Sequence, residues 1–229
     1  MFRALFTICS VLLLDQWLKI WIKISRPLGD SQKIMGDFFY FHFIENPGMA
    51  FGLEFGGETG KLILSLFRVA AAFGIAWYLR KLILDKQHRG LIFAVSLIFA
   101  GAVGNIIDSA FYGLIFDKGS IWNGNYYESY LGLAELCSFG DGYAGVFQGN
   151  VVDMLYFPLI EGHFPDWMPL WGGQEFTFFR PVFNIADAAI TAGVFYIILN
   201  QKSFFHKEES PEEERELEEG KSSLEAEEA

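Results

Sequence analysis

Three aspartates are the residues best placed to carry chemistry, because each lies within or beside an apolar run. Asp108 ends one long apolar stretch, Asp187 lies near the start of another, and Asp153 interrupts the short run VVDM at 151–154. Two carboxyl groups held together at low dielectric cannot easily both ionise, so one keeps a proton while the other stays charged. Such a pair supplies an acid and a base for hydrolysis by water. The residues alone do not choose which two of the three form it.

Residues for other hydrolytic schemes are missing or poorly spaced. The chain contains four histidines, namely His42, His88, His163 and His206. They show no paired metal-ligand spacing, so a zinc site is not expected. No GxSxG motif occurs, and a Cys137–His163 nucleophilic pair would require a coincidence within a long loop. There is no glycine-rich phosphate loop either, and Gly101 and Gly104 are expected to permit close helix packing.

Four stretches are long and apolar enough to cross a membrane, which takes about 20 helical residues. They cover residues 4–24, 62–79, 91–111 and 182–199. The first could pass for a secretory signal, but it shows no convincing cleavage site and three more apolar stretches follow it. The sequence therefore predicts a mainly α membrane protein with four transmembrane helices in a domain over 1–200.

Positive charge predicts how these helices are oriented. Four basic residues crowd the short turn between the second and third stretches: Arg80, Lys81, Lys86 and Arg89. Such turns face the cytoplasm, which would place both termini inside as well. The long connection at 112–181 contains only Lys118 and Arg180 as bases, as expected of an external segment.

Polar residues gather near the predicted outer ends of the helices. They are Asp15 and Lys19 in the first stretch, Asn105 and Asp108 in the third, and Asn184 and Asp187 in the fourth. Ionisable groups are costly in a membrane, so several at one depth predict a shared polar site. Asp15 and Lys19 are one helical turn apart and could form either a structural pair that reaches the headgroups or part of the chemistry. Arg68 has no evident partner and is interpreted as structural.

Two external connections join the helices. The aromatic run DFFYFHF at 37–43 and the turn signal Asn46-Pro47-Gly48 predict a β-hairpin or cradle within 36–58. This hairpin could be purely structural, or it could lie on the bilayer and contact a substrate. The connection at 112–181 is too long for a simple loop and is expected to be a small inserted external subdomain.

The C-terminal segment is strongly acidic. Residues 206–229 contain 11 acidic and three basic residues, which gives −8 of the formal net charge of −11. We expect 201–229 to be a disordered cytoplasmic tail, with either a solubilising or a partner-binding role. The remaining body is nearly neutral, so nucleic-acid binding is not expected.

Five ordered motifs resemble the signatures of the lipoprotein signal peptidase (type II signal peptidase) family. They are DQWLK at 15–19, ENPGMAFG at 45–52, GNIID at 104–108, VVDM at 151–154 and FNIADAAI at 183–190. The resemblance, which covers about 2–199, implies an aspartic endopeptidase without a metal or organic cofactor. It implies removal of the signal peptide from diacylglyceryl-modified prolipoproteins just before the lipidated cysteine, at the outer face of the bacterial cytoplasmic membrane.

The resemblance also selects the catalytic pair, which falls on Asp153 and Asp187. The supporting positions that match the family are Asp15, Lys19, Asn46, Gly48, Asn105, Asp108 and Asn184. Two departures stand out. Ser109 occupies a position where the family usually has arginine, whose role Arg180 could take, and the segment between Asp108 and Asp153 is longer than in compact members.

Membrane lipids and prolipoproteins are the expected partners, and a monomer is the simplest expectation. A proton-coupled transporter and a noncatalytic membrane scaffold are the alternative functions. A transporter would need polar groups along the whole bilayer depth, and the inner halves of the third and fourth stretches lack them.

Overall fold

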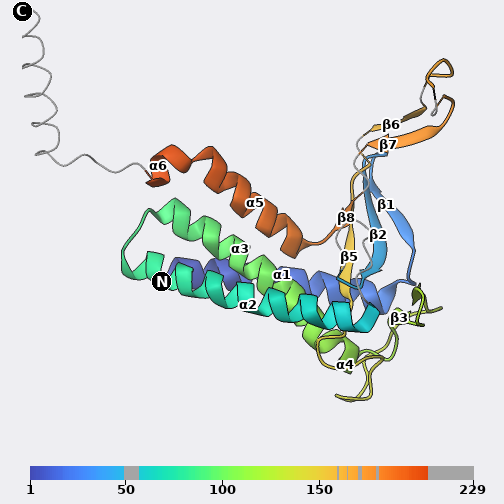
Figure 1. Cartoon of the computed structure of the whole chain (residues 1–229), viewed down its shortest axis with the longest axis horizontal. Coiled ribbons are helices and arrows are strands. Elements are labelled where there is room, and N and C mark those ends of the chain that lie inside the picture. The colour runs from blue at the N-terminus through green and yellow to red at the C-terminus, as the bar shows by residue number, and fades with distance from the viewer. Residues whose placement is uncertain (49–56, 159, 164, 170–171, 179–180, 206–229) are drawn as a thin grey trace, which may run out of the picture.

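A computed structural model describes residues 1–48, 57–158, 160–163, 165–169, 172–178 and 181–205. Its main feature is a group of apolar helices that run alongside one another, with a small sheet across one end (Figure 1). The helices are α1 (Phe2–Ser25), α2 (Gly57–Leu84), α3 (Arg89–Ile107) and α5 (Ile185–Leu199). The first three are long enough to span a membrane, and α5 is a shorter apolar helix of 15 residues, or about 22 Å. The prediction of a mainly helical membrane fold is confirmed.

The fourth apolar stretch does not begin as a helix, which corrects its predicted start at 182. Val182–Phe183 form the short strand β8, and α5 begins only at Ile185. The Asn184 side chain accepts a hydrogen bond from the backbone N–H of Asp187, and the Asp187 carboxylate accepts one from the N–H of Asn184. This capping box fixes the start of α5 at Asn184. The apolar residues before it therefore lie outside the helix and can pair as a strand.

Glycines allow α3 to approach its neighbours closely. A β-carbon at Gly101 would lie 2.2 Å from the carbonyl oxygen of Ala186, and one at Gly104 would lie 2.8 Å from a carboxylate oxygen of Asp15. The predicted role of both glycines in helix packing is confirmed. Just beyond, α3 passes into the π-helix η1 (Asp108–Tyr112) and the short α4 (Gly113–Ile115). The wider turn of a π-helix is a frequent feature of functional sites.

The sheet has the strand order β1-β2-β5-β8, and all its pairs are antiparallel. It comprises β1 (Ser31–Met35), β2 (Phe39–Asn46), β5 (Val151–Tyr156) and β8. The predicted hairpin exists, but its first strand lies before residue 36 and its turn lies between β1 and β2. The other edge of β2 pairs with β5, so that Ile44 faces Asp153. This pairing joins residues more than a hundred positions apart, which local strand patterns cannot reveal. Residues 49–56 of the predicted cradle lie outside the described part.

The long connection contributes two further pairs of strands. One pair is β3 (Ile121–Trp122) with β4 (Tyr127–Glu128), and the other is β6 (Ile160–His163) with β7 (Glu175–Phe178). Since β5 belongs to the main sheet, the long connection is part of the main fold and not a separate appended unit.

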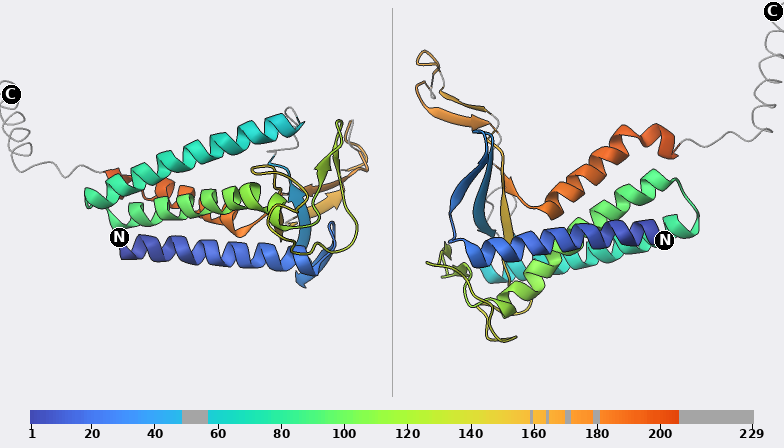
Figure 2. Two further views of the ribbon diagram at one scale, coloured as in Figure 1. Left: turned by 90° about the horizontal axis from the view of Figure 1, so that it is seen from below. Right: turned by 180° about the vertical axis from the view of Figure 1, so that it is seen from behind.

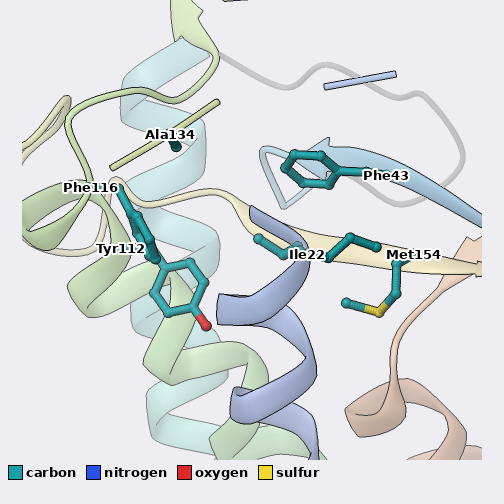
Figure 3. Packing of buried hydrophobic residues seen from close by; sticks show 7 residues of the cluster. Ile22, Phe43, Tyr112, Phe116, Ala134 and Met154 are labelled. Atoms are coloured by element: carbon teal, nitrogen blue, oxygen red, sulfur yellow. The ribbon is translucent and has the colours of Figure 1, made fainter. Parts of the chain in front are cut away.

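Buried apolar residues join the helices to the sheet at the same end (Figure 3). The cluster consists of Ile22, Phe43, Tyr112, Phe116, Ala134, Val152 and Met154. It brings together α1, β2, η1, the long connection and β5. Val152 and Met154 belong to this cluster, so apolar packing holds the residues of β5 immediately before and after Asp153.

A buried polar cluster centred on Glu45 fastens the long connection to β2. The Glu45 carboxylate pairs with Lys23, and both side chains are almost completely buried. It also accepts hydrogen bonds from the N–H of Ser120 at 2.7 Å, from Asn150 at 2.8 Å and from the Tyr130 hydroxyl at 3.1 Å. Glu45 immediately precedes Asn46, so this cluster also bears on the polar site described below.

The helical part of the chain extends past the predicted boundary at residue 200. Gln201–Phe205 form the helix α6, and Phe204 is buried close to the His88 ring. The predicted disordered tail therefore cannot start at 201. Residues 206–229 lie outside the described part.

Candidate active site

Asp153 lies on the central strand β5, and its side chain is nearly inaccessible, with 2% exposure for the residue. One carboxylate oxygen accepts a hydrogen bond from the Asn184 side-chain amide at 2.6 Å, and the other accepts one from Asn46 at 3.3 Å. Burial, followed by the negative charge of Asp187, raises the pKa of Asp153 from 3.8 to about 7. Lys19 and the two asparagines oppose this shift only in part. With this pKa, Asp153 is about half protonated at pH 7 and mostly protonated below it.

Asp187 lies in the first turn of α5 and is only half-buried. Its carboxylate accepts a hydrogen bond from Asn105 at 2.7 Å and a longer one from the N–H of Asn184 at 3.4 Å. The N-terminal end of a helix favours negative charge, so this position suits an ionised carboxylate. The two aspartates differ in environment, which is what an acid–base pair requires.

Asn184 connects the two aspartates directly. Its amide donates to Asp153, while its backbone N–H and side-chain oxygen contact Asp187. The same amide donates to the Asn105 side-chain oxygen at 3.1 Å, and Asn105 in turn donates to Asp187. The structure thus brings together the two aspartates and both predicted supporting asparagines.

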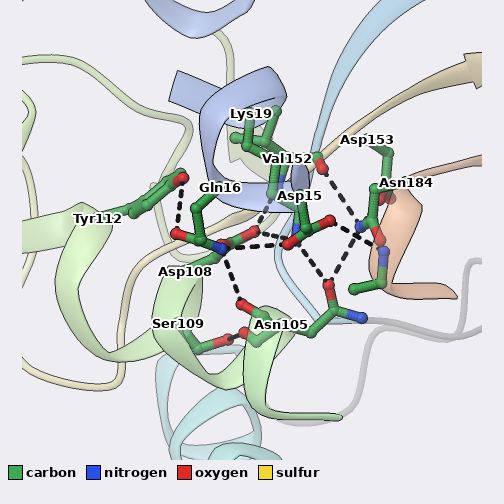
Figure 4. A network of polar contacts seen from close by, with 12 residues as sticks. Asp15, Gln16, Lys19, Asn105, Asp108, Ser109, Tyr112, Val152, Asp153 and Asn184 are labelled. Atoms are coloured by element: carbon green, nitrogen blue, oxygen red, sulfur yellow. Dashed lines mark hydrogen bonds and ion pairs between the residues drawn. The ribbon is translucent and has the colours of Figure 1, made fainter. Parts of the chain in front are cut away.

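Lys19 is the centre of a buried ion network beside this pair (Figure 4). Its ammonium group lies 2.9 Å from Asp15 and 2.8 Å from Asp108, and it donates to the Asn105 side-chain oxygen at 2.9 Å. An ammonium group has three N–H donors, and these three acceptors use all of them. The predicted Asp15–Lys19 pair is confirmed. Both side chains are fully buried, so the pair does not reach out to the headgroups.

The two carboxylates that pair with Lys19 also accept hydrogen bonds from backbone N–H groups next to Asp153 and Asp187. Asp15 accepts the N–H of Ala186 at 2.9 Å, and Asp108 accepts the N–H of Val152 at 3.2 Å. Ala186 precedes Asp187, and Val152 precedes Asp153. Asp108, the third candidate from the sequence, is therefore engaged in orienting β5.

Gln16 is a member of the network that the sequence analysis did not single out. Its side-chain amide donates to Asp108 at 2.8 Å and to the carbonyl oxygen of Gly104 at 3.2 Å. Its oxygen accepts a hydrogen bond from the Tyr112 hydroxyl at 3.2 Å. Its place between Asp15 and Lys19, as a polar residue within an apolar helix, was the available signal.

Arg68, which has no evident partner in the sequence, has one in the structure, at the edge of the site. Its guanidinium donates to the carbonyl oxygen of Gly48 at 3.3 Å and interacts electrostatically with Asp187 and Asp153. The N–H of Gly48 donates to the side-chain oxygen of Asn46 at 2.9 Å, in a turn that requires the positive φ of 98°. Arg68 therefore braces the segment that carries Asn46.

Ser109 lies at the position where the family usually has arginine, and the described contacts of its hydroxyl stay within its own helix. Ser109 is buried, and its hydroxyl donates to the carbonyl oxygen of Asn105 in its own helix at 3.1 Å. Arg180, the replacement suggested by the sequence, lies outside the described residues. Of the arginines in the described part, Arg68 is one that the structure does bring to the site.

Apolar helices that end at two carboxyl groups of unequal environment, bridged by Asn184, fit a membrane aspartic peptidase. Residues 7–203 match the family model described as signal peptidase (SPase) II. The chain therefore belongs to the signal peptidase II family.

The names of similar proteins agree with this assignment. The chain is 47% identical over 193 residues to a lipoprotein signal peptidase of Porphyromonas gingivalis, which covers 84% of this chain and 79% of the relative. It is 36% identical over 193 residues to a lipoprotein signal peptidase of Amoebophilus asiaticus, which covers 83% and 73% respectively.

Solved structures share the fold. A bacterial membrane enzyme determined by the in meso method at 2.3 Å resolution superposes with a TM-score of 0.56 at 24% identity, covering 91% of this chain and 93% of that one. A second such structure, at 1.9 Å resolution, gives a TM-score of 0.54 at 23% identity, with coverage of 88% and 93%.

Proposed function

We propose that this protein removes the signal peptide from diacylglyceryl-modified prolipoproteins, cutting immediately before the lipidated cysteine, with Asp153 and Asp187 as the catalytic pair. Membership of the signal peptidase II family and the names of its relatives support the substrate class. The observation that carries the mechanism is Asn184, whose side-chain amide donates to the Asp153 carboxyl group and whose backbone N–H donates to the Asp187 carboxyl group. The same proposal gives the other predicted site residues the role of shaping the site around this pair; they are Asp15, Lys19, Asn46, Gly48, Asn105, Asp108 and Asn184.

Asp187 is the base in this mechanism, because it is half-exposed and lies at a helix N-terminus. It takes a proton from a water molecule as the water oxygen attacks the scissile carbonyl carbon. Asp153 is the acid, since its raised pKa of about 7 keeps a large fraction of it protonated near neutral pH, and it gives its proton to the carbonyl oxygen. Collapse of the tetrahedral intermediate breaks the C–N bond. The departing cysteine amine takes the proton from Asp187, and the hydroxyl proton returns to Asp153.

The position of the site fits a substrate held in a bilayer. The pair lies where the apolar helices meet the sheet, so a substrate helix packed along the bundle could present its end to the pair (Figure 1). Apolar side chains are exposed on the β1–β2 hairpin: Ile34, Met35 and Phe38. Exposed apolar side chains of this kind can insert at the boundary between headgroups and acyl chains, where the hairpin could support the lipidated end of the substrate. With the basic α2–α3 turn in the cytoplasm, the site would face the outer side and both termini the cytoplasm.

A purified cleavage assay tests this proposal, with lipidated and unlipidated precursor side by side. Asp153→Asn and Asp187→Asn are each expected to abolish processing of the lipidated precursor while the protein stays folded in detergent. Asp141→Asn is the matched control, because Asp141 is an exposed aspartate of the long connection. Normal turnover by both active-site variants would refute the catalytic pair, and equal cleavage of the unlipidated precursor would refute the lipid requirement.

A further inference from the structure

A crevice opens at the end of the helices opposite the sheet. It has a volume of about 830 Å³ and lies between the start of α1, the α2–α3 turn and one face of α5. Figure 2 shows the N-terminus beside the α2–α3 turn, far from the strands. The volume is within the range of roughly 300–1,000 Å³ that is usual for sites of small molecules.

The polar rim of the crevice is positively charged. Arg3, Lys86 and Arg89 line it, and no Asp or Glu of the described residues does. None of these three side chains forms an ion pair or a hydrogen bond within the described part of the chain. Three cations around one concavity, with no counter-ion there from the described residues, attract an anionic ligand.

The walls of the crevice are apolar. They include Phe2, Ile83, Ile92, Phe93 and Tyr196. Phe2 and Phe93 are also exposed on the outer surface of the helices, which faces lipid in a membrane. A soluble anion would neutralise the rim but leave these walls uncovered, whereas a phospholipid supplies both a phosphate and hydrocarbon chains.

We propose that this crevice binds an anionic phospholipid of the cytoplasmic leaflet. Arg3, Lys86 and Arg89 hold the phosphate, and the acyl chains run along the apolar walls of α1, α3 and α5. Basic pockets between helices on the cytoplasmic side are a known physical solution for anionic headgroups. The site is separate from the aspartate pair, at the other end of the bundle.

The acidic C-terminal segment is the competing occupant. It follows α6, whose Phe204 packs against the α2–α3 turn near Gly90, and its 11 acidic residues complement the basic rim. However, it contains only two large apolar residues, Leu217 and Leu224, and so could do little to cover the apolar walls. For this reason the lipid is the favoured occupant.

The test compares two double variants of the full-length protein in neutral detergent. Lys86→Ala with Arg89→Ala removes two cations from the crevice. Arg80→Ala with Lys81→Ala removes two cations from the same end of the helices that do not line it. Binding of phosphatidylglycerol and of phosphatidylcholine is measured by native mass spectrometry and by titration of thermal stability.

The unaltered protein is expected to prefer phosphatidylglycerol. The crevice variant should bind it about 25-fold more weakly, if each of the two cations contributes about fivefold, while the control pair should change affinity by less than about threefold. Equal weakening in both pairs, or equal binding of the two lipids by the unaltered protein, would overturn the proposal. Precursor cleavage serves as a separate readout, because the aspartate pair is remote and should remain active in both variants.

A third full-length variant neutralises part of the acidic segment. It carries Glu208→Gln, Glu209→Gln, Glu212→Gln, Glu213→Gln, Glu214→Gln and Glu216→Gln. Unchanged phosphatidylglycerol binding supports the lipid as the resident occupant. Binding that occurs only in this variant would assign the crevice to the acidic segment and overturn the proposal.

Discussion

The carboxylate of Asp108 accepts a hydrogen bond from the backbone N–H of Val152 at 3.2 Å, one residue before Asp153. Asp15 does the same for Ala186, one residue before Asp187. Lys19 holds both carboxylates. Through these two carboxylates, the ammonium group of Lys19 on α1 helps to position both β5 and α5, which carry the two aspartates.

Lys19→Met should be the most destabilising change in this network. It leaves the buried carboxylates of Asp15 and Asp108 without their cation, and breaking a buried pair in this way costs about 3–5 kcal/mol. Asp108→Asn should cost less, because Asp15 and Lys19 still balance each other. Unfolding by denaturant in detergent measures both variants. If Lys19→Met proved as stable as the unaltered protein, the network would not be holding the site.

The raised pKa of Asp153 predicts a pH dependence of catalysis. If Asp153 is the acid, kcat/KM should fall as pH rises through about 7, because its proton is lost there. The measurement is a pH–rate profile with lipidated precursor. A profile that stays flat up to pH 9 would remove Asp153 from the role of acid.

The same pKa makes a prediction for stability. The pKa of Asp153 rises from 3.8 to about 7 on folding, so its contribution to stability is complete below pH 3.8 and is lost as pH rises toward 7. Asp153→Asn cannot ionise and should therefore lose less stability than the unaltered protein between pH 4 and 7. Unfolding of the two proteins across this window tests the sign. A steeper loss in Asp153→Asn would contradict it.

Two changes at Asn184 separate its role as helix cap from its role as bridge. Asn184→Ser keeps a good cap for α5 but cannot reproduce the amide contacts to Asp153 and Asn105, so it should stay nearly as stable and lose at least about 90% of its activity. Asn184→Ala loses both roles and should lose about a further 1 kcal/mol of stability. Thermal unfolding and cleavage rates are compared. Full activity in Asn184→Ser would show that the bridge is dispensable.

Glu45→Gln should loosen the long connection. Its buried partner Lys23 would lose its counter-ion, at a cost of about 3 kcal/mol. Because Asn46 follows directly and contacts Asp153, cleavage should slow as well. Limited proteolysis between residues 117 and 150 measures the loosening, with Glu135→Gln as the control since Glu135 is exposed in the same segment. Equal protease resistance in both variants would count against Glu45 as the fastening point.

The sequence determined the helices because hydrophobicity is a local property that accumulates along one stretch. Three of the four apolar stretches became long helices close to their predicted positions. The fourth was misplaced at its start, since a short apolar run before a capping residue suits a strand as well as a helix. The aspartates were also visible as isolated acids beside apolar runs, although the residues alone left three candidates and only the family resemblance chose two.

The tertiary structure decided how those acids are surrounded. Pairing of β2 with β5 places Asn46 against Asp153, 107 positions away, and α3 brings Asn105 to Asp187. Gln16 and Arg68 acquired partners that no local spacing predicted. Hydrogen bonds between distant segments depend on where whole helices and strands pack. The sequence therefore nominates the chemical groups, and only the folded arrangement fixes their environment and hence their proton affinity.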